Sequence, residues 1–177
     1  MEANPQLDFS NTAIAFAGKS DQELRKSYWM FRLMNAKWLV ESLSALAPIA
    51  LKLRLPIDPL VKATVYDQFC GGESIAGCEK SMDELYRYGI GTILDYSVEG
   101  KASEAEFDAC QAEIIRTIAK AKGDVRIPFS VFKTTGVVRF GLLEKINAGT
   151  ALSAEEQAEW ERAQKRVDGI AKAAFEA

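Results

Sequence analysis

The sequence predicts an α/β protein in which a helical N-terminal segment, residues 1–67, precedes a region of alternating helices and strands, residues 68–177. Two observations carry this prediction. Apolar residues recur at helical spacing along the first segment, whereas two short apolar runs, 90–96 and 127–133, interrupt the helical patterns of the second. Short connections in a helix–strand–helix–strand order are typical of parallel strands joined by right-handed crossovers.

The helices of the first segment follow from local signals. Ser20 and Glu23 form a capping box, which predicts a helix beginning there. A second helical run covers 38–53, where Pro48 is expected to kink or split it, and a third is expected to start at Pro59. We expect the aromatic and apolar residues between Tyr28 and Leu46 to form a core between helices, with a membrane or partner surface as the alternative.

The second region carries two more capping boxes, Ser103 with Glu106 and Ser153 with Glu156, and each predicts the start of a long helix. Residues 68–71 are a candidate first strand. The expected elements are a helix over 74–88, a strand over 90–96, a helix over 103–122, a strand over 127–133, a helix over 136–147 and a helix over 153–175.

The composition excludes several functional classes. The chain has 177 residues and a net charge of −3, so it is long enough for a buried core and has no basic field for nucleic acid. It has no histidine, which excludes Ser-His-Asp and Cys-His triads and histidine-ligated zinc. Cys70, Cys78 and Cys110 lack a CxxC spacing, so we expect buried thiols in a reducing compartment and no metal site.

No signal-peptide core is present, and the longest apolar stretch, 43–51, is too short to cross a bilayer. These features predict a soluble cytoplasmic protein.

Asp95 and Lys133 are the candidate site residues, because each stands at the C-terminal end of an expected strand. Adjacent parallel strands lie about 4.8 Å apart, so the two side chains are expected to reach each other or one bound ligand. A carboxylate at the end of a buried strand is costly unless it is paired. For Lys133 the readings are an ion pair with a surface acid, a clamp for a substrate carboxylate or phosphate, or a Schiff-base amine.

Three motifs carry a resemblance to a known family. The runs 68–73 (QFCGGE), 91–99 (GTILDYSVE) and 128–136 (PFSVFKTTG) closely resemble the proline dehydrogenase family. The resemblance implies an incomplete (β/α)8 TIM-type barrel, made of the first two or three parallel strands with their crossover helices. It also implies an FAD-dependent oxidoreductase of proline catabolism that oxidises L-proline to 1-pyrroline-5-carboxylate and is reoxidised by a membrane quinone. In that family's pattern Asp95 is the catalytic aspartate and Lys133 binds the proline carboxylate.

The chain departs from the family's pattern after the third motif. The second aspartate, the Arg-Gly-Ala-Tyr and Thr-His motifs and the paired arginines of the family are absent, so no residue of this chain is assigned to flavin binding. We therefore expect the N-terminal portion of such an enzyme, truncated and inactive by itself. Its expected partners are a C-terminal half or a second copy at an open sheet edge, and peripheral contact with the inner membrane is a further expectation.

Two other functions stay open, and with them the question of whether this chain is an enzyme. One is a class I aldolase-type barrel fragment that uses Lys133 as its Schiff-base amine. The other is a non-catalytic interaction module that docks through the helices between Tyr28 and Leu46.

Overall fold

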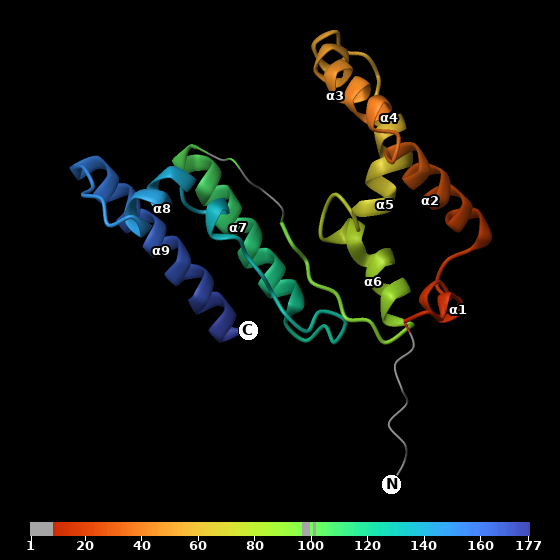
Figure 1. Cartoon of the computed structure of the whole chain (residues 1–177). Helices are drawn as coiled ribbons and strands as arrows, with labels where there is room; N and C mark the ends of the chain where they lie inside the picture. Colours follow the sequence, from red (N-terminus) through yellow and green to blue (C-terminus); the bar gives the residue numbers. More distant parts are fainter. Residues whose placement is uncertain (1–8, 97–99, 101) are drawn as a thin grey trace. The chain divides into compact units, whose positions relative to one another are not determined.

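The structure, a computed structural model, describes residues 9–96, 100 and 102–177 (Figure 1). The chain divides into two compact units, unit 1 up to Glu73 and unit 2 from Ser74. The 97–99 end of the second resemblance motif lies outside the described residues, as does the polar leader 1–8. In the part of the chain that the structure describes, no helix is both long and apolar enough to cross a membrane.

Unit 1 consists of helices, of which α2 begins at the capping box that the sequence predicts. The Ser20 hydroxyl accepts a hydrogen bond from the Glu23 amide at 3.3 Å, and the Glu23 carboxylate accepts one from the Ser20 amide at 2.7 Å. The predicted capping box is therefore confirmed. The helix is not split at Pro48, because α3 continues through it, and a kink at this position stays a prediction. The helices are α1 (Thr12–Ala15), α2 (Asp21–Met34), α3 (Lys37–Lys52), α4 (Asp58–Val61), the π-helix η1 (Lys62–Tyr66) and α5 (Asp67–Phe69).

Most large apolar side chains of unit 1 are exposed, and none of its described residues is buried. Trp38, for example, is 71% exposed. The contacts between α2 and α5 include an ion pair of Lys26 with Asp67 and a hydrogen bond from the Ser27 hydroxyl to the Gln68 side-chain oxygen at 2.6 Å. Phe31 and Phe69 make an edge-to-face contact, with ring centroids 6.0 Å apart. The expectation of a core between Tyr28 and Leu46 is therefore wrong for this unit.

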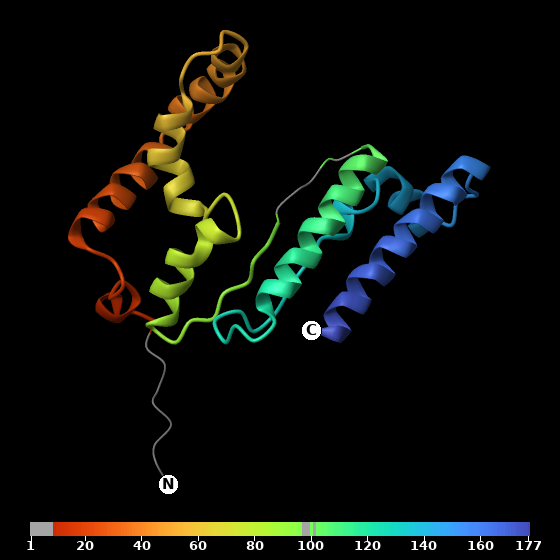
Figure 2. The same ribbon diagram turned by 180° about the vertical axis from the view of Figure 1, so that it is seen from behind.

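Unit 2 is built on two long helices, α7 and α9, which pack side by side (Figure 2). Both predicted capping boxes, at Ser103 and at Ser153, are confirmed by their reciprocal hydrogen bonds. The helices of the unit are the 3₁₀-helix η2 (Ala76–Cys78), α6 (Glu79–Tyr86), α7 (Glu104–Ala121), the 3₁₀-helix η3 (Thr134–Gly136), α8 (Phe140–Asn147) and α9 (Ala154–Glu176).

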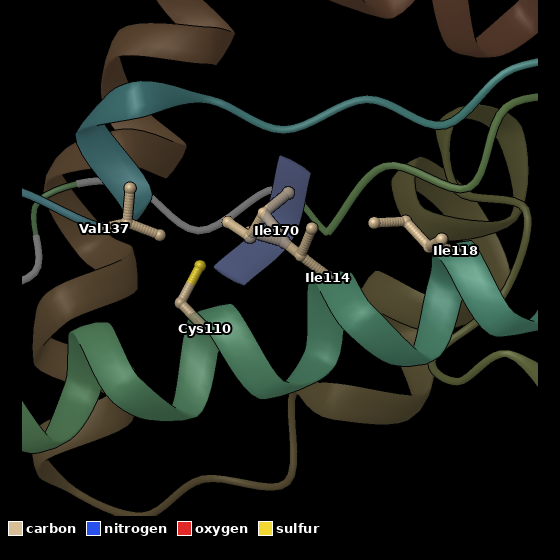
Figure 3. Close-up of a cluster of buried hydrophobic side chains, with 5 residues drawn as sticks. All are labelled: Cys110, Ile114, Ile118, Val137 and Ile170. Atoms are coloured by element: carbon tan, nitrogen blue, oxygen red, sulfur yellow. The ribbon is translucent and has the colours of Figure 1, made fainter. Parts of the chain in front are cut away.

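Three clusters of buried side chains form the core of unit 2. Figure 3 shows the first, in which α7 and α9 meet the segment after η3. The second joins α6 to the two extended segments 90–96 and 127–133, and the third joins α8 to α9. The clusters comprise Cys110, Ile114, Ile118, Val137 and Ile170, then Met82, Leu94 and Ile127, then Val138, Leu142 and Ala163.

The prediction of an incomplete (β/α)8 TIM-type barrel is wrong, because the described residues contain no β-strand. The two expected strands are extended segments without a ladder of hydrogen bonds. The Thr92 amide of the first segment donates to the carbonyl of Arg126, which directly precedes the second segment, at 2.7 Å. Pro128 has no amide to donate, and a Cβ added to Gly91 would lie 2.9 Å from its ring. A sheet needs a regular succession of such bonds.

The expectation of three buried thiols also needs correction. Cys110 is buried between α7 and α9, whereas Cys78 is half-buried and Cys70 is exposed. Burial of Cys110 follows from its place on the apolar face of α7.

Candidate functional site

Asp95 and Lys133 form an ion pair in unit 2. The Lys133 Nζ lies 3.2 Å from the Asp95 Oδ2, and the two side chains are 39% and 35% exposed, respectively. The sequence placed both at the ends of neighbouring extended runs, and the structure brings them into contact. A pair this exposed is worth at most about 1 kcal/mol, so it contributes little to the stability of unit 2.

Lys133 is fixed through the backbone that follows it. It is the N-cap residue of η3, and its carbonyl accepts a hydrogen bond from the Gly136 amide at 2.9 Å. The next residues, Val137 and Val138, are fully buried. The Arg166 guanidinium of α9 donates to the Val137 carbonyl at 3.3 Å. The short helix that begins at Lys133 is thus anchored to the core of unit 2.

Asp95 is fixed by the residues before it. Leu94 is buried and packs against Met82 of α6 and Ile127. Thr92 donates twice to the Arg126 carbonyl, from its amide at 2.7 Å and from its hydroxyl at 3.2 Å. Asp95 therefore emerges from a segment whose preceding residues are tied to 126–127.

Sequence reasoning missed the arginine at the centre of this arrangement. The Arg126 guanidinium donates to the carboxylates of Asp124 at 2.6 Å, Asp83 at 2.6 Å and Glu79 at 2.8 Å. Lys120 joins the network through Glu79 at 2.6 Å and Asp124 at 2.9 Å. Hydrogen bonds from Arg126 and then Lys120 hold the pKa of the Asp124 carboxyl well below its usual range. A visible signal was that two acidic residues, Glu79 and Asp83, lie four positions apart on one helix. Like charges at this spacing repel each other, which indicates a cation nearby.

A second cation, the buried Arg166 of α9, was also missed. Its guanidinium donates to Asp108 at 2.7 Å, contacts Glu104, and lies 5.4 Å from the centroid of the Phe107 ring. Burial acts to lower the pKa of Arg166, but its two carboxylate partners outweigh burial and raise it. Hydrogen bonding, first from Arg162 and then from Arg166, lowers the pKa of Glu104 to about 2.

The pair offers one cation and one carboxylate at a position open to solvent. An ammonium group binds a ligand carboxylate, and a carboxylate accepts a hydrogen bond from a ligand ammonium group. The arrangement suits a small zwitterion such as an amino acid. Among the described residues, no group of acidic or thiol side chains could hold a metal ion.

The described residues do not fit a flavin beside this pair. Two hollows, with volumes of about 640 Å³ and 530 Å³, border α9, and neither is lined by Asp95 or Lys133. The exposure of the pair itself agrees with an open surface at this position.

Comparison with known proteins identifies relatives by sequence. The chain is 33% identical over 147 residues to "Proline dehydrogenase 1, mitochondrial" of Dictyostelium discoideum, which covers 81% of this chain and 26% of that protein. It is 31% identical over 120 residues to the Bos taurus protein of the same name, covering 63% of this chain and 20% of that one. It is also 28% identical over 94 residues to "Carbapenem antibiotics biosynthesis protein CarD" of Pectobacterium carotovorum, covering 53% of this chain and 25% of that protein.

The chain spans about a quarter of the length of these curated relatives, or less. No family model matches it, and no solved structure does. The expectation of a cytoplasmic location is contradicted by the relatives, since those named proline dehydrogenase are mitochondrial proteins.

Proposed function

The chain belongs to the proline dehydrogenase family, and from that premise we propose that it supplies substrate-binding residues for the oxidation of L-proline to 1-pyrroline-5-carboxylate. The observation that supports this proposal is the 3.2 Å contact between Lys133 and Asp95 at a solvent-open position. L-Proline carries one carboxylate and one secondary ammonium group, which are the complements of these two side chains.

In this proposal Lys133 binds the carboxylate of proline, and Asp95 accepts a hydrogen bond from the ring nitrogen. Each protein charge then exchanges its partner for an opposite charge of the substrate. The oxidation removes a hydride from a ring carbon and a proton from the ring nitrogen, leaving a carbon–nitrogen double bond. Lys133 and Asp95 bind and orient the substrate for this step and do not accept the hydride.

The family's flavin, FAD, is proposed to be bound by residues other than those described here, since the two hollows that border α9 are not lined by Asp95 or Lys133. Contact with a quinone acceptor is likewise proposed to involve residues other than those described here. The names of the relatives favour a mitochondrial setting for the reaction.

The test is anaerobic reduction of FAD by L-proline, with and without the C-terminal portion of a curated relative supplied as a separate chain. We expect the flavin to bleach only in the complemented sample. Lys133→Met should then lower kcat/KM about a hundredfold, because a charge-assisted contact with the substrate is lost. Arg116→Gln, which removes an exposed cation of α7, is the matched control and should leave the rate unchanged. Absence of bleaching in every sample, or equal rates for both variants, would overturn the proposal.

A further inference from the structure

The carbonyl of Arg126 joins the segment that carries Asp95 to the rest of unit 2. It accepts both Thr92 hydrogen bonds, three residues before Asp95. The next side chain, Ile127, is buried against Leu94, directly before Asp95. The position of residue 126 therefore sets the path of the chain into Asp95.

The side chain of Arg126 determines where that carbonyl lies. Only 17% of the side chain is exposed, and its guanidinium bridges Asp124 on its own turn to Glu79 and Asp83 on α6. Its bond to Asp124 uses two guanidinium nitrogens, with Nε at 2.9 Å and Nη2 at 2.6 Å, and a planar fork of this kind fixes direction as well as distance. Replacement of Arg126 would leave three carboxylates facing one another with Lys120 as the remaining cation.

A second feature shows how closely the two extended segments approach. The missing side chain of Gly91 admits the ring of Pro128, since a Cβ there would lie 2.9 Å from the Pro128 Cγ. Close approach at 91 and 128, together with the bonds between 92 and 126, sets how far apart Asp95 and Lys133 stand.

From this geometry we infer that Arg126 is a positioning residue for the Asp95–Lys133 pair, acting through its carbonyl and Thr92. The inference deepens the proposed function, on which its significance for proline binding rests. The geometric claim itself concerns only the pair.

Zero-length coupling with a carbodiimide tests the claim in the whole chain. The reagent activates the Asp95 carboxyl, and the Lys133 amine then attacks the activated carbonyl and displaces the reagent. An amide bond forms, and the reagent leaves as a urea that has taken up the elements of water. Mass spectrometry of the digested chain measures the 95–133 cross-link, and Asp95→Asn identifies it by abolishing it. We expect Arg126→Gln to lower its yield about tenfold, because loss of one partner from a bridged set of charges is strongly destabilising to their arrangement.

Arg139→Gln is the matched control, because Arg139 is also partly buried and binds Glu159 through two guanidinium nitrogens, at 3.1 Å and 2.8 Å. It should keep the cross-link although it removes a comparable ion pair from unit 2. If circular dichroism shows that Arg126→Gln does not fold, Thr92→Pro is the deciding variant. Proline at 92 has no amide proton to donate to the Arg126 carbonyl, and the guanidinium network stays in place. An undiminished cross-link in a folded Arg126→Gln or in Thr92→Pro overturns the inference, as does an equal loss in Arg139→Gln.

The cross-link and the flavin assay fail independently. A lost cross-link in Arg126→Gln without bleaching by any complemented sample supports the positioning role and rejects the proposed function. The reverse result rejects the positioning role alone.

Discussion

Units 1 and 2 each contain a helix that begins with a capping box, yet only unit 2 buries side chains among its described residues. The capping box at Ser20 of α2 has the same reciprocal bonds as those at Ser103 of α7 and Ser153 of α9. In unit 2 the apolar faces of α7 and α9 close over a core, whereas those of α2 and α3 face solvent. The difference shows that local signals suffice to start a helix and that a core requires a partner of complementary shape.

This contrast has an energetic consequence for each unit. Isolated helices of 14 to 16 residues, the lengths of α2 and α3, are marginal in water without packing. Unit 2 is therefore expected to account for most of the cooperative unfolding of the chain. The following variants test that division.

The largest effect is expected from truncating a leucine in each unit. Leu142 of α8 is fully buried, and Leu142→Ala should lower the free energy of unfolding by about 3 kcal/mol. Leu60 of α4 is 67% exposed, and Leu60→Ala should change it by less than about 0.5 kcal/mol. Urea unfolding followed by circular dichroism measures both. Similar losses would mean that unit 1 possesses a core and would break the comparison.

A smaller effect on stability is expected from removing one paired cation in each unit. Arg166→Ala should destabilise unit 2 by about 2 kcal/mol, because it empties a buried position and removes the partner of Glu104 and Asp108. Lys26→Ala removes the exposed ion pair of unit 1 and should cost no more than about 1 kcal/mol. Thermal unfolding of both variants compares them. A larger loss for Lys26→Ala would contradict the assignment of stability to unit 2.

Acid should weaken unit 2 through Glu104. Its pKa is about 2 in the folded unit and near 4.5 ordinarily, so the unfolded chain binds this proton first as the pH falls. Its contribution is complete above about pH 4.5 and is lost as the pH approaches about 2. Urea midpoints across this window should fall less steeply for Glu104→Gln. Parallel curves for the two proteins would remove Glu104 as the cause.

The smallest effect concerns the contact between α7 and α9. A Cβ at Gly169 would lie 2.5 Å from the Gln111 Nε2, which donates to the Arg166 carbonyl at 3.1 Å. Gly169→Ala should gain about 1 kcal/mol of helix propensity and lose about as much with this hydrogen bond, for a net change near zero. In a Gln111→Ala background the same substitution should stabilise unit 2 by about 1 kcal/mol. Strong destabilisation in that background would show a clash beyond the glutamine.

The features that could be predicted are those encoded within a few residues. A capping box joins positions three apart, so Ser20, Ser103 and Ser153 identify their helices directly. The extended character of 90–96 and 127–133 also follows from local composition. Whether such a run becomes a strand depends on neighbours that supply a ladder, and no local pattern contains them.

The candidate site also has features that could be predicted from local patterns and features that could not. The adjacency of Asp95 and Lys133 followed from two similar runs that end in charged residues, although a sheet was the wrong reason for it. The spacing of Glu79 and Asp83 indicated a cation nearby but not which one, since Arg126 meets Glu79 across 47 positions, and Arg166 meets Glu104 across 62. A single sequence does not show which distant acid an arginine will meet.

The three cysteines differ in exposure, so their rates of modification report when different parts of the chain open. Cys70 of unit 1 is exposed, so a thiol reagent should modify it at the rate of an unprotected thiol. Burial raises the pKa of the Cys78 thiol, which slows its reaction by reducing the thiolate fraction. Cys110 lies between α7 and α9, so its modification must wait for these helices to separate. Three reaction phases in one sample would therefore report separately on the exposed thiol of Cys70, the half-buried thiol of Cys78 and the core thiol of Cys110.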